Sequence, residues 1–269
     1  MIQEPISTQT LPPPPPSIYF GGCGYGFPYY IGVYQAMMDR WGPDFPDNTI
    51  VCGDGVGSLM AIGITLKHTL ESMKQVYLDL GKDVFESPGA FEQLCLLPFL
   101  HRNPETLEKV NDKCLLGTGK FFSQHVWRTH WETKIDLLQD LRNAMHIPVL
   151  FKRIQNDCGK LDYHEIVDGT YSLSGRELPH GNDTLCIGCD STFDISIPLP
   201  LSQQLFFQRG SAFQELYDKG YHAFSQWDGV LNAKATHKQP NFLALVVLWL
   251  LKLLELMIEF AEFYREIVL

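Results

Sequence analysis

Residues 17–26, Ser17-Ile-Tyr-Phe-Gly-Gly-Cys-Gly-Tyr-Gly26, form a short apolar run that breaks into closely spaced glycines. Residues 29–41 follow with helical composition, so this stretch predicts a strand, a glycine loop and a helix. Residues 49–52 begin a second unit, which breaks into Gly53-Asp-Gly-Val-Gly57 and continues as a helix to about residue 66. Two such units in succession predict a parallel, doubly wound α/β sheet.

The rest of the chain adds elements of both kinds around these two units. Helical patterns are found at about residues 70–80, 104–115, 133–144 and 212–227, and strand-like runs at 147–154, 163–167 and 184–187. Ahead of the first strand, Pro12–Pro16 form a polyproline tract that can enter neither a helix nor a central strand. We expect a Pro-rich arm at 1–16, in the simplest interpretation a disordered tail, a domain at 17–235 and a helix at 240–269.

Composition excludes several classes of protein. The chain has 269 residues, of which 45% are hydrophobic and 12% aromatic, enough for a full core. A net charge of −10 would repel a phosphate backbone, so nucleic acid is not an expected partner. Seven scattered cysteines indicate a reducing compartment. Residues 1–17 lack the basic and apolar regions of a signal peptide, so we expect none there. We therefore expect an intracellular, cytoplasmic protein, which could act at a lipid or membrane surface.

The C-terminal region holds the longest apolar run, at residues 242–251. Ten residues are too few to span a bilayer, which requires about 20. Farther along, five charged residues recur at helical spacing and would form one stripe of an amphipathic helix: Lys252, Glu255, Glu259, Glu262 and Glu266. Because four of these are acidic, anionic lipid is not the expected target. Residues 242–269 could pack on a neutral lipid surface, on a partner protein, on a second copy or on their own domain.

The two glycine turns suit the binding of negative charge. A glycine turn ahead of a helix presents backbone N–H groups either to a phosphate or to the oxyanion of an acyl-transfer reaction. The dinucleotide pattern is incomplete, since Phe27 stands where its third glycine belongs. The second turn has the outer glycines of a nucleophile elbow, Gly53 and Gly57, with Gly55 in place of the central serine. Asp168 ends a strand-like run and could act as a base.

These motifs resemble the patatin-like phospholipases, most closely the branch of adipose triglyceride lipase and adiponutrin. The resemblance rests on the glycine loop at Gly22-Cys-Gly-Tyr25, the elbow at Gly53–Gly57, the Val167-Asp-Gly169 motif and residues 182–198 and 219–232. It covers roughly residues 17–232. It implies a three-layer α/β/α fold with a mainly parallel central sheet, and a lipid acyl hydrolase activity that needs neither metal nor cofactor.

The resemblance also implies a role for each matching position. Gly22, Cys23 and Gly24 would form the oxyanion hole, Asp168 would be the base, and Gly55 stands at the nucleophile position. Glycine has no side-chain atom that could attack an ester, so covalent acyl transfer by the family mechanism cannot proceed.

Asp54 is a second departure from the family pattern. A carboxylate beside the elbow would oppose an oxyanion, and we expect it to face the oxyanion loop. We do not expect Ser58, Cys52 or Cys23 to replace the missing nucleophile, because none of them stands at the apex of the elbow.

The sequence therefore favours a catalytically inactive pseudoenzyme that binds a lipid, an acyl ester or a protein. Two alternatives stay open. The chain could be a nucleophile variant of an active hydrolase, or a structural protein that reuses the fold and self-associates through residues 242–269 and the Pro-rich arm. Two bland interpretations accompany them. Gly55 would relax a strained turn, and Asp168 could cap the glycine turn. The Cys186-x-x-Cys189 pair is interpreted as two core cysteines, since no second pair for a metal lies near it.

Overall fold

The computed structural model describes residues 12–86, 105–120, 125–145, 166–168, 177–189, 191–200, 203–204, 207–208 and 210–231, and single residues between 246 and 257. Its strands are β1 (Ser17–Phe20), β2 (Ile50–Asp54), β3 (Cys114–Lys120), β4 (His125–Arg128), β5 (Ile166–Asp168), β6 (Thr184–Gly188) and β7 (Ile195–Ser196). Its α-helices are α1 (Phe27–Trp41), α2 (Val56–Thr65), α3 (Leu70–Glu86), α5 (Thr106–Val110), α6 (Lys134–Ala144) and α8 (Ser211–Ser225). Short 3-10 helices are η1 (Gly24–Gly26), η2 (Phe45–Asn48) and η6 (Gly181–Asp183).

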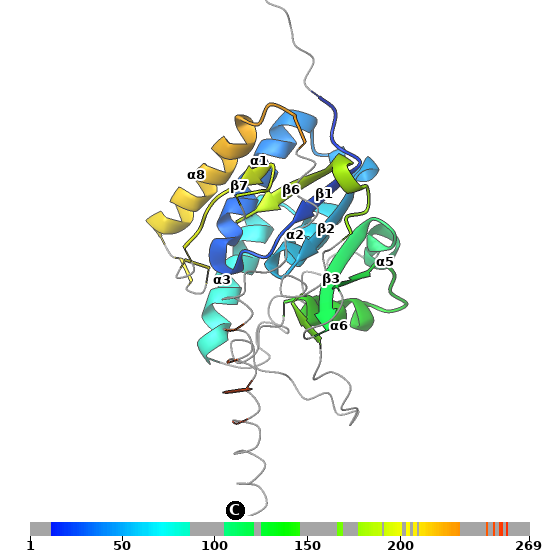
Figure 1. Ribbon diagram of the computed structural model, residues 1–269, viewed down its shortest axis with the longest axis vertical. Helices are drawn as coiled ribbons and strands as arrows, with labels where there is room; N and C mark the ends of the chain where they lie inside the picture. The colour runs from blue at the N-terminus through cyan, green and yellow to red at the C-terminus, as the bar shows by residue number, and fades with distance from the viewer. Residues whose placement is uncertain are drawn as a thin grey trace, which may run out of the picture.

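The strands form one sheet in the order β4-β3-β2-β1-β6-β7, with β5 paired to β3. Pairs among β1, β2, β3, β6 and β7 are parallel, whereas β4 and β5 run antiparallel to β3. The expected α/β class with a mainly parallel sheet is confirmed. Figure 1 shows α8 beside α1 at one end of this sheet, and β3, α5 and α6 at the other.

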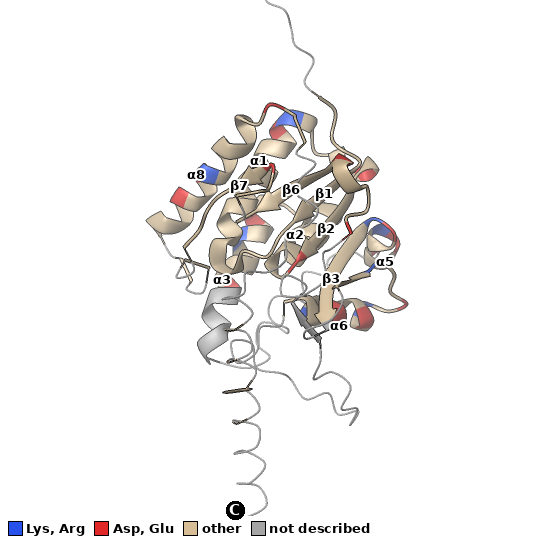
Figure 2. Cartoon of the chain, in the orientation of Figure 1, with Lys and Arg blue, Asp and Glu red and all other residues tan. Residues whose placement is uncertain are grey.

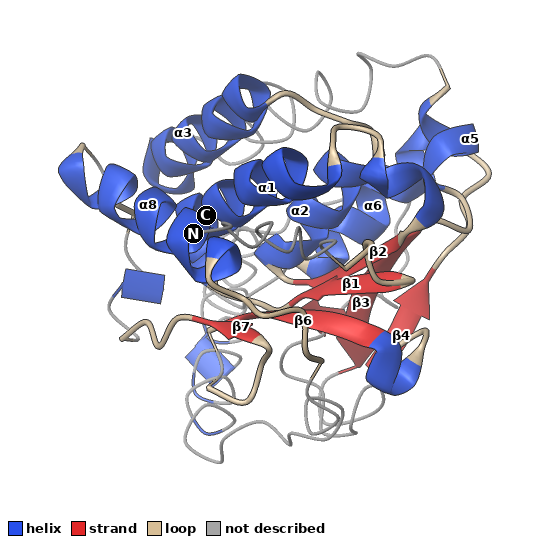
Figure 3. Ribbon diagram, turned by 90° about the horizontal axis from the view of Figure 1, so that it is seen from above, coloured by secondary structure: helices blue, strands red, loops and turns tan. Residues whose placement is uncertain are grey.

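The two faces of the sheet carry different side chains because strand residues alternate in direction. Ile18 and Phe20 belong to the main apolar cluster, which the helices complete, whereas Tyr19 belongs to a smaller cluster with Cys52 and Cys186. In Figure 3 helices α1, α2, α6 and α8 lie on the same side of the sheet. Tyr19, Cys52 and Cys186 therefore lie on the second face of the sheet, opposite the helices.

Helices α1 and α8 pack unusually closely, which fixes α1 and the glycine loop ahead of it. A Cβ atom on Gly32 would overlap the backbone of Tyr217, and one on Gly220 would overlap the backbone of Tyr29. Each helix thus supplies a glycine where the other crosses it, and this close contact requires the absence of a side chain.

The polyproline tract lies against the domain. The indole N–H of Trp41 donates to the Pro12 carbonyl at 3.0 Å, and the Thr49 hydroxyl donates to the Pro15 carbonyl at 3.1 Å. The Ile50 N–H donates to the Pro16 carbonyl at 2.9 Å. These contacts correct the expectation of a disordered tail for Pro12–Pro16, because carbonyl groups of a proline tract can still accept hydrogen bonds.

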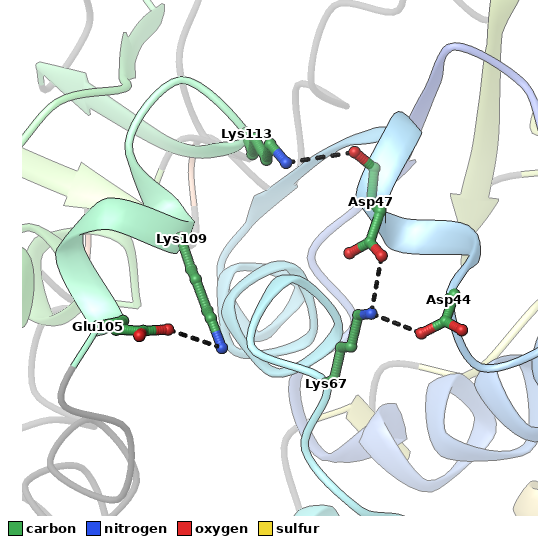
Figure 4. Close-up of polar contacts among 6 residues, drawn as sticks. All are labelled: Asp44, Asp47, Lys67, Glu105, Lys109 and Lys113. Carbon is green, nitrogen blue, oxygen red and sulfur yellow. Dashed lines mark hydrogen bonds and ion pairs between the residues drawn. The ribbon is translucent and has the colours of Figure 1, made fainter.

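A group of charged side chains holds the amino ends of β2 and β3 to the far end of α2 (Figure 4). The Lys67 ammonium lies 2.7 Å from Asp44 and 2.9 Å from Asp47, and Lys113 donates to the Asp47 carbonyl at 3.2 Å. Both carboxylates are exposed, so each pair contributes at most about 1 kcal/mol. In Figure 2 charges of both signs lie along the helices and loops, while β1, β6 and β7 carry none.

One expected helix is wrong in its second half. α5 ends at Val110, Asp112 has a φ of 64° that turns the chain, and β3 starts at Cys114. Residues 114–119 are buried between β2 and β4, and this burial overrides their helical pattern. Residues 147–154 and 163–165, where we expected strands, lie outside the described residues.

The helix expected at 240–269 is described at five residues, all helical: Val246, Leu250, Leu253, Leu254 and Met257. Apart from the partly buried Val246, these side chains are 43% to 62% exposed. Across the described ranges, no helix is long and apolar enough to cross a membrane.

Candidate functional site

Both glycine turns lie at the carboxyl edge of the parallel strands. β1 and β2 pair with Phe20 opposite Gly53, so the glycine loop after β1 and the elbow after β2 leave the sheet side by side. Ligands of open α/β sheets bind at this edge. The register thus brings the turns at Gly22–Gly24 and Gly53–Gly57 to the same edge of the sheet.

The turn at Gly53–Gly57 has the geometry of a tight strand-to-helix elbow. Gly55 caps the N-terminus of α2 with φ 57° and ψ −133°, a conformation that residues with a Cβ adopt only under strain. A Cβ on Gly53 would overlap the backbone of Gly57, and one on Gly57 would overlap the Phe20 carbonyl. The outer glycines are therefore required by backbone packing, and the apex has a backbone conformation that glycine adopts without strain.

The glycine loop lies directly before α1. Gly24 has a φ of 52°, and a Cβ there would overlap the carbonyl of Gln204. The Gly26 N–H donates to the Cys23 carbonyl at 2.9 Å, and the Cys23 side chain is 1% exposed. Gly22 and Gly24 are partly exposed, and in the described part of the chain their N–H groups donate to no carbonyl. These N–H groups are suited to meet an oxygen of a ligand.

Asp168 lies next to the elbow by the register of the strands. Asp54 pairs with Gly117 of β3, and Asp168 pairs with Thr118, one residue farther along. At Thr118 one edge of β3 is paired with β4. β5 therefore pairs with the opposite edge of β3, the same edge along which β2 runs as far as the elbow. The register thus brings the backbone of Asp168 close to the elbow.

Asp54 is engaged on the face of the sheet opposite α2. Its side chain is fully buried; Oδ2 accepts from the Tyr19 hydroxyl at 2.7 Å, and Oδ1 lies 2.8 Å from Nε2 of His125. We expected this carboxylate to face the oxyanion loop. Its described partners instead lie on the second face, because Asp54 follows Gly53 in a strand and points the opposite way from α2.

His125 contacts Asp54 beside the elbow, a contact that the sequence did not indicate. Its side chain is 2% exposed, and its ring lies edge-on to Trp127 with centroids 4.5 Å apart. Gly117 makes room for the pair, since a Cβ there would overlap Oδ1 of Asp54. His125 and Asp54 are 71 residues apart, so no local motif announces their contact.

The neighbouring side chains have structural roles, in agreement with the sequence interpretation. Ser58 is fully buried in the first turn of α2, and its hydroxyl donates to the Gly53 carbonyl at 2.9 Å. The Cys52 thiol is fully buried and donates to the Ile18 carbonyl at 3.4 Å. Both hold the elbow strand from inside, away from the apex.

Comparison with known proteins adds no relative. No protein-family model matches this chain, and no curated protein matches it. Within the residues that the structure describes, no three His, Cys, Asp or Glu side chains gather to hold a metal ion. The function proposed below therefore rests on the geometry at the carboxyl edge of the sheet.

Proposed function

We propose that the chain is a patatin-like lipid acyl hydrolase fold that has lost its nucleophile and acts by binding a lipid or a protein. The finer arrangement that this includes, three layers of α/β/α around the sheet, is part of the proposal. The observation that carries it is Gly55, which has the backbone conformation of an elbow apex and lies between two glycines that backbone packing requires.

The ligand class follows from what remains at the edge. Partly exposed N–H donors at Gly22 and Gly24 suit an ester carbonyl or a carboxylate, while the apex offers no atom for covalent attack. A long-chain fatty acid or a non-cleaved acyl ester is the ligand that this combination favours. The chain would bind such a group without turning it over.

Two assays test the proposal. The purified chain should not hydrolyse a p-nitrophenyl acyl ester and should not react with a fluorophosphonate probe, and it should bind a fluorescent long-chain fatty acid. Hydrolysis by the unaltered chain, lost on Asp168→Ala, would overturn it, as would absence of binding to both fatty acid and ester analogue. A Gly22→Val variant, which crowds the loop, should weaken the binding.

The Gly55→Ser variant separates the pseudoenzyme from a variant of an active hydrolase. Strong fluorophosphonate labelling and ester hydrolysis by Gly55→Ser would favour the active alternative. A folded but silent Gly55→Ser protein, tested also with Asp54→Ala, would favour an older loss of activity. Circular dichroism of each variant shows whether the protein is folded.

A second candidate is an assembly protein, and the exposed apolar residues of the C-terminal region favour it. Val246, Leu250, Leu253, Leu254 and Met257 are spaced by 4, 3, 1 and 3 residues, which places them on one helical face. Light scattering on the whole chain and on a chain shortened at residue 239 tests this candidate. An unchanged monomer mass for both would count against it.

A further inference from the structure

Two thiols lie just beyond the ends of neighbouring parallel strands, on the same side of the sheet. β1 pairs with β6 with Phe20 opposite Ile187, and the Gly21 N–H continues the ladder by donating to the Ile187 carbonyl at 2.9 Å. Cys23 follows Phe20 by three residues, and Cys189 follows Ile187 by two. Both side chains pack in the main apolar cluster under α1. The strand register thus brings the two cysteines to one corner of the glycine loop.

A tyrosine hydroxyl marks this corner. The Tyr30 hydroxyl donates to the Gly21 carbonyl at 2.6 Å, and a Cβ on Gly188 would lie 3.4 Å from the same hydroxyl. Burial, followed by the neighbouring thiols of Cys23 and Cys189, raises the pKa of Tyr30 well above its usual value. One phenol therefore interacts with both cysteines, which come from different strands.

The positions of the two cysteines suit a cross-link. Two steps beyond the Phe20–Ile187 pair, the register sets Cys189 opposite Gly22, the residue before Cys23. Cys23 itself has left the strand at the turn into η1, with φ −136° and ψ 7°, and its side chain shares the main apolar cluster and the Tyr30 phenol with Cys189. Cys186 does not compete for Cys189 although only two residues separate them, because Cys186 packs on the opposite face with Tyr19 and Cys52.

We propose that Cys23 and Cys189 form an oxidisable dithiol, which a hydroperoxide converts to a disulfide that ties the glycine loop to the end of β6. Cys189, which is partly exposed, attacks the peroxide oxygen and becomes a sulfenic acid as the O–O bond breaks and water or an alcohol leaves. The buried Cys23 thiol then attacks that sulfur: the S–S bond forms, the S–O bond breaks, and the hydroxyl leaves with the thiol proton as water. Two electrons pass from the two thiols to the peroxide.

The cross-link would restrain the loop whose N–H groups line the candidate site. Cys23 precedes η1, so a covalent bond there limits the opening of Gly24–Gly26 and the first turn of α1. The cross-link would form whether or not the site binds a lipid, because the side chains of Cys23 and Cys189 have no part in the proposed function.

Peptide mapping of the whole chain tests the proposal. After treatment with hydrogen peroxide and digestion without reductant, mass spectrometry should find a Cys23–Cys189 peptide pair that dithiothreitol removes. Amide hydrogen exchange at residues 24–27 should slow in the oxidised protein by at least several-fold. Cys189→Ser and Cys23→Ser should each abolish the cross-link.

Cys186→Ser is the matched control, since Cys186 is on the same strand but on the other face, and it should leave the cross-link intact. A dominant link from Cys189 to Cys186, Cys95 or Cys158, or between two chains, would overturn the proposal. Oxidation of Cys189 to a sulfinic acid without any link to Cys23 would overturn it as well.

Discussion

The Tyr19 hydroxyl donates to Oδ2 of Asp54 at 2.7 Å, between two neighbouring parallel strands and away from the helices. Oδ1 of the same carboxylate lies 2.8 Å from Nε2 of His125. Both oxygens of a fully buried acid are thus paired with side chains from other strands. Asp54, the residue before Gly55, is therefore part of a polar network on the second face of the sheet.

Removal of one member of this network should destabilise the fold strongly. Asp54→Ala leaves the His125 ring and the Tyr19 hydroxyl buried without their carboxylate, and we expect a loss of about 3 kcal/mol in the free energy of unfolding. Urea unfolding followed by circular dichroism measures the loss. Lys67→Ala, which removes only exposed ion pairs, should cost less than about 1 kcal/mol. Equal losses for both variants would contradict a structural role of the network.

Gly117→Ala should also destabilise the protein, because its methyl group would overlap Oδ1 of Asp54. The expected loss is about 1–3 kcal/mol, as for overpacking elsewhere. If the clash with Asp54 causes this loss, the two substitutions should not be additive. In the double variant with Asp54→Ala, the methyl group of Gly117→Ala meets no carboxylate. A double-mutant cycle by urea unfolding should therefore give a coupling energy well above about 0.5 kcal/mol. Simple additivity would show that the clash is relieved in another way.

The outer glycines of the elbow should tolerate no side chain. Gly57→Ala would overlap the Phe20 carbonyl, so we expect a loss above about 2 kcal/mol or a failure to fold. Gly181→Ala is the matched control, since it meets no atom within 4 Å and carries only the strain of a φ of 52°. Its loss should be about 1 kcal/mol. Thermal unfolding of the two variants would contradict this if Gly181→Ala were the less stable.

Alkaline pH should destabilise the chain in part through Cys114. Burial raises the pKa of the Cys114 thiol from 9.0 to about 12. Between these values the folded state keeps the proton that the unfolded state has lost, so stability falls as pH rises from 9 to 12, by up to about 1.4 kcal/mol per unit. In Cys114→Ala the slope of unfolding free energy against pH should be smaller over this interval. An unchanged slope would contradict the assignment.

The glycines of the site were predictable from the sequence, whereas its polar network was not. At Gly53 and Gly57 a neighbouring backbone segment lies too close for any side chain, so the spacing of these glycines in the sequence indicates the shape of the turn directly. His125 reaches Asp54 only because β4 folds back on β3, a pairing that no local pattern predicts. The helix expected at residues 104–115 likewise extended too far, because helical spacing reports the propensity of local residues and not the burial of β3 between its neighbours.

The docking of Pro12 on Trp41 has a practical consequence for handling the protein. Trp41 is the last residue of α1, and the glycine loop precedes the first residue of that helix. A helix of 15 residues is about 22 Å long. A fluorophore or affinity handle attached just ahead of Pro12 would start at the far end of α1 from Gly24. Such a label could be used for surface immobilisation or anisotropy measurements while the ligand-facing edge stays open to solution.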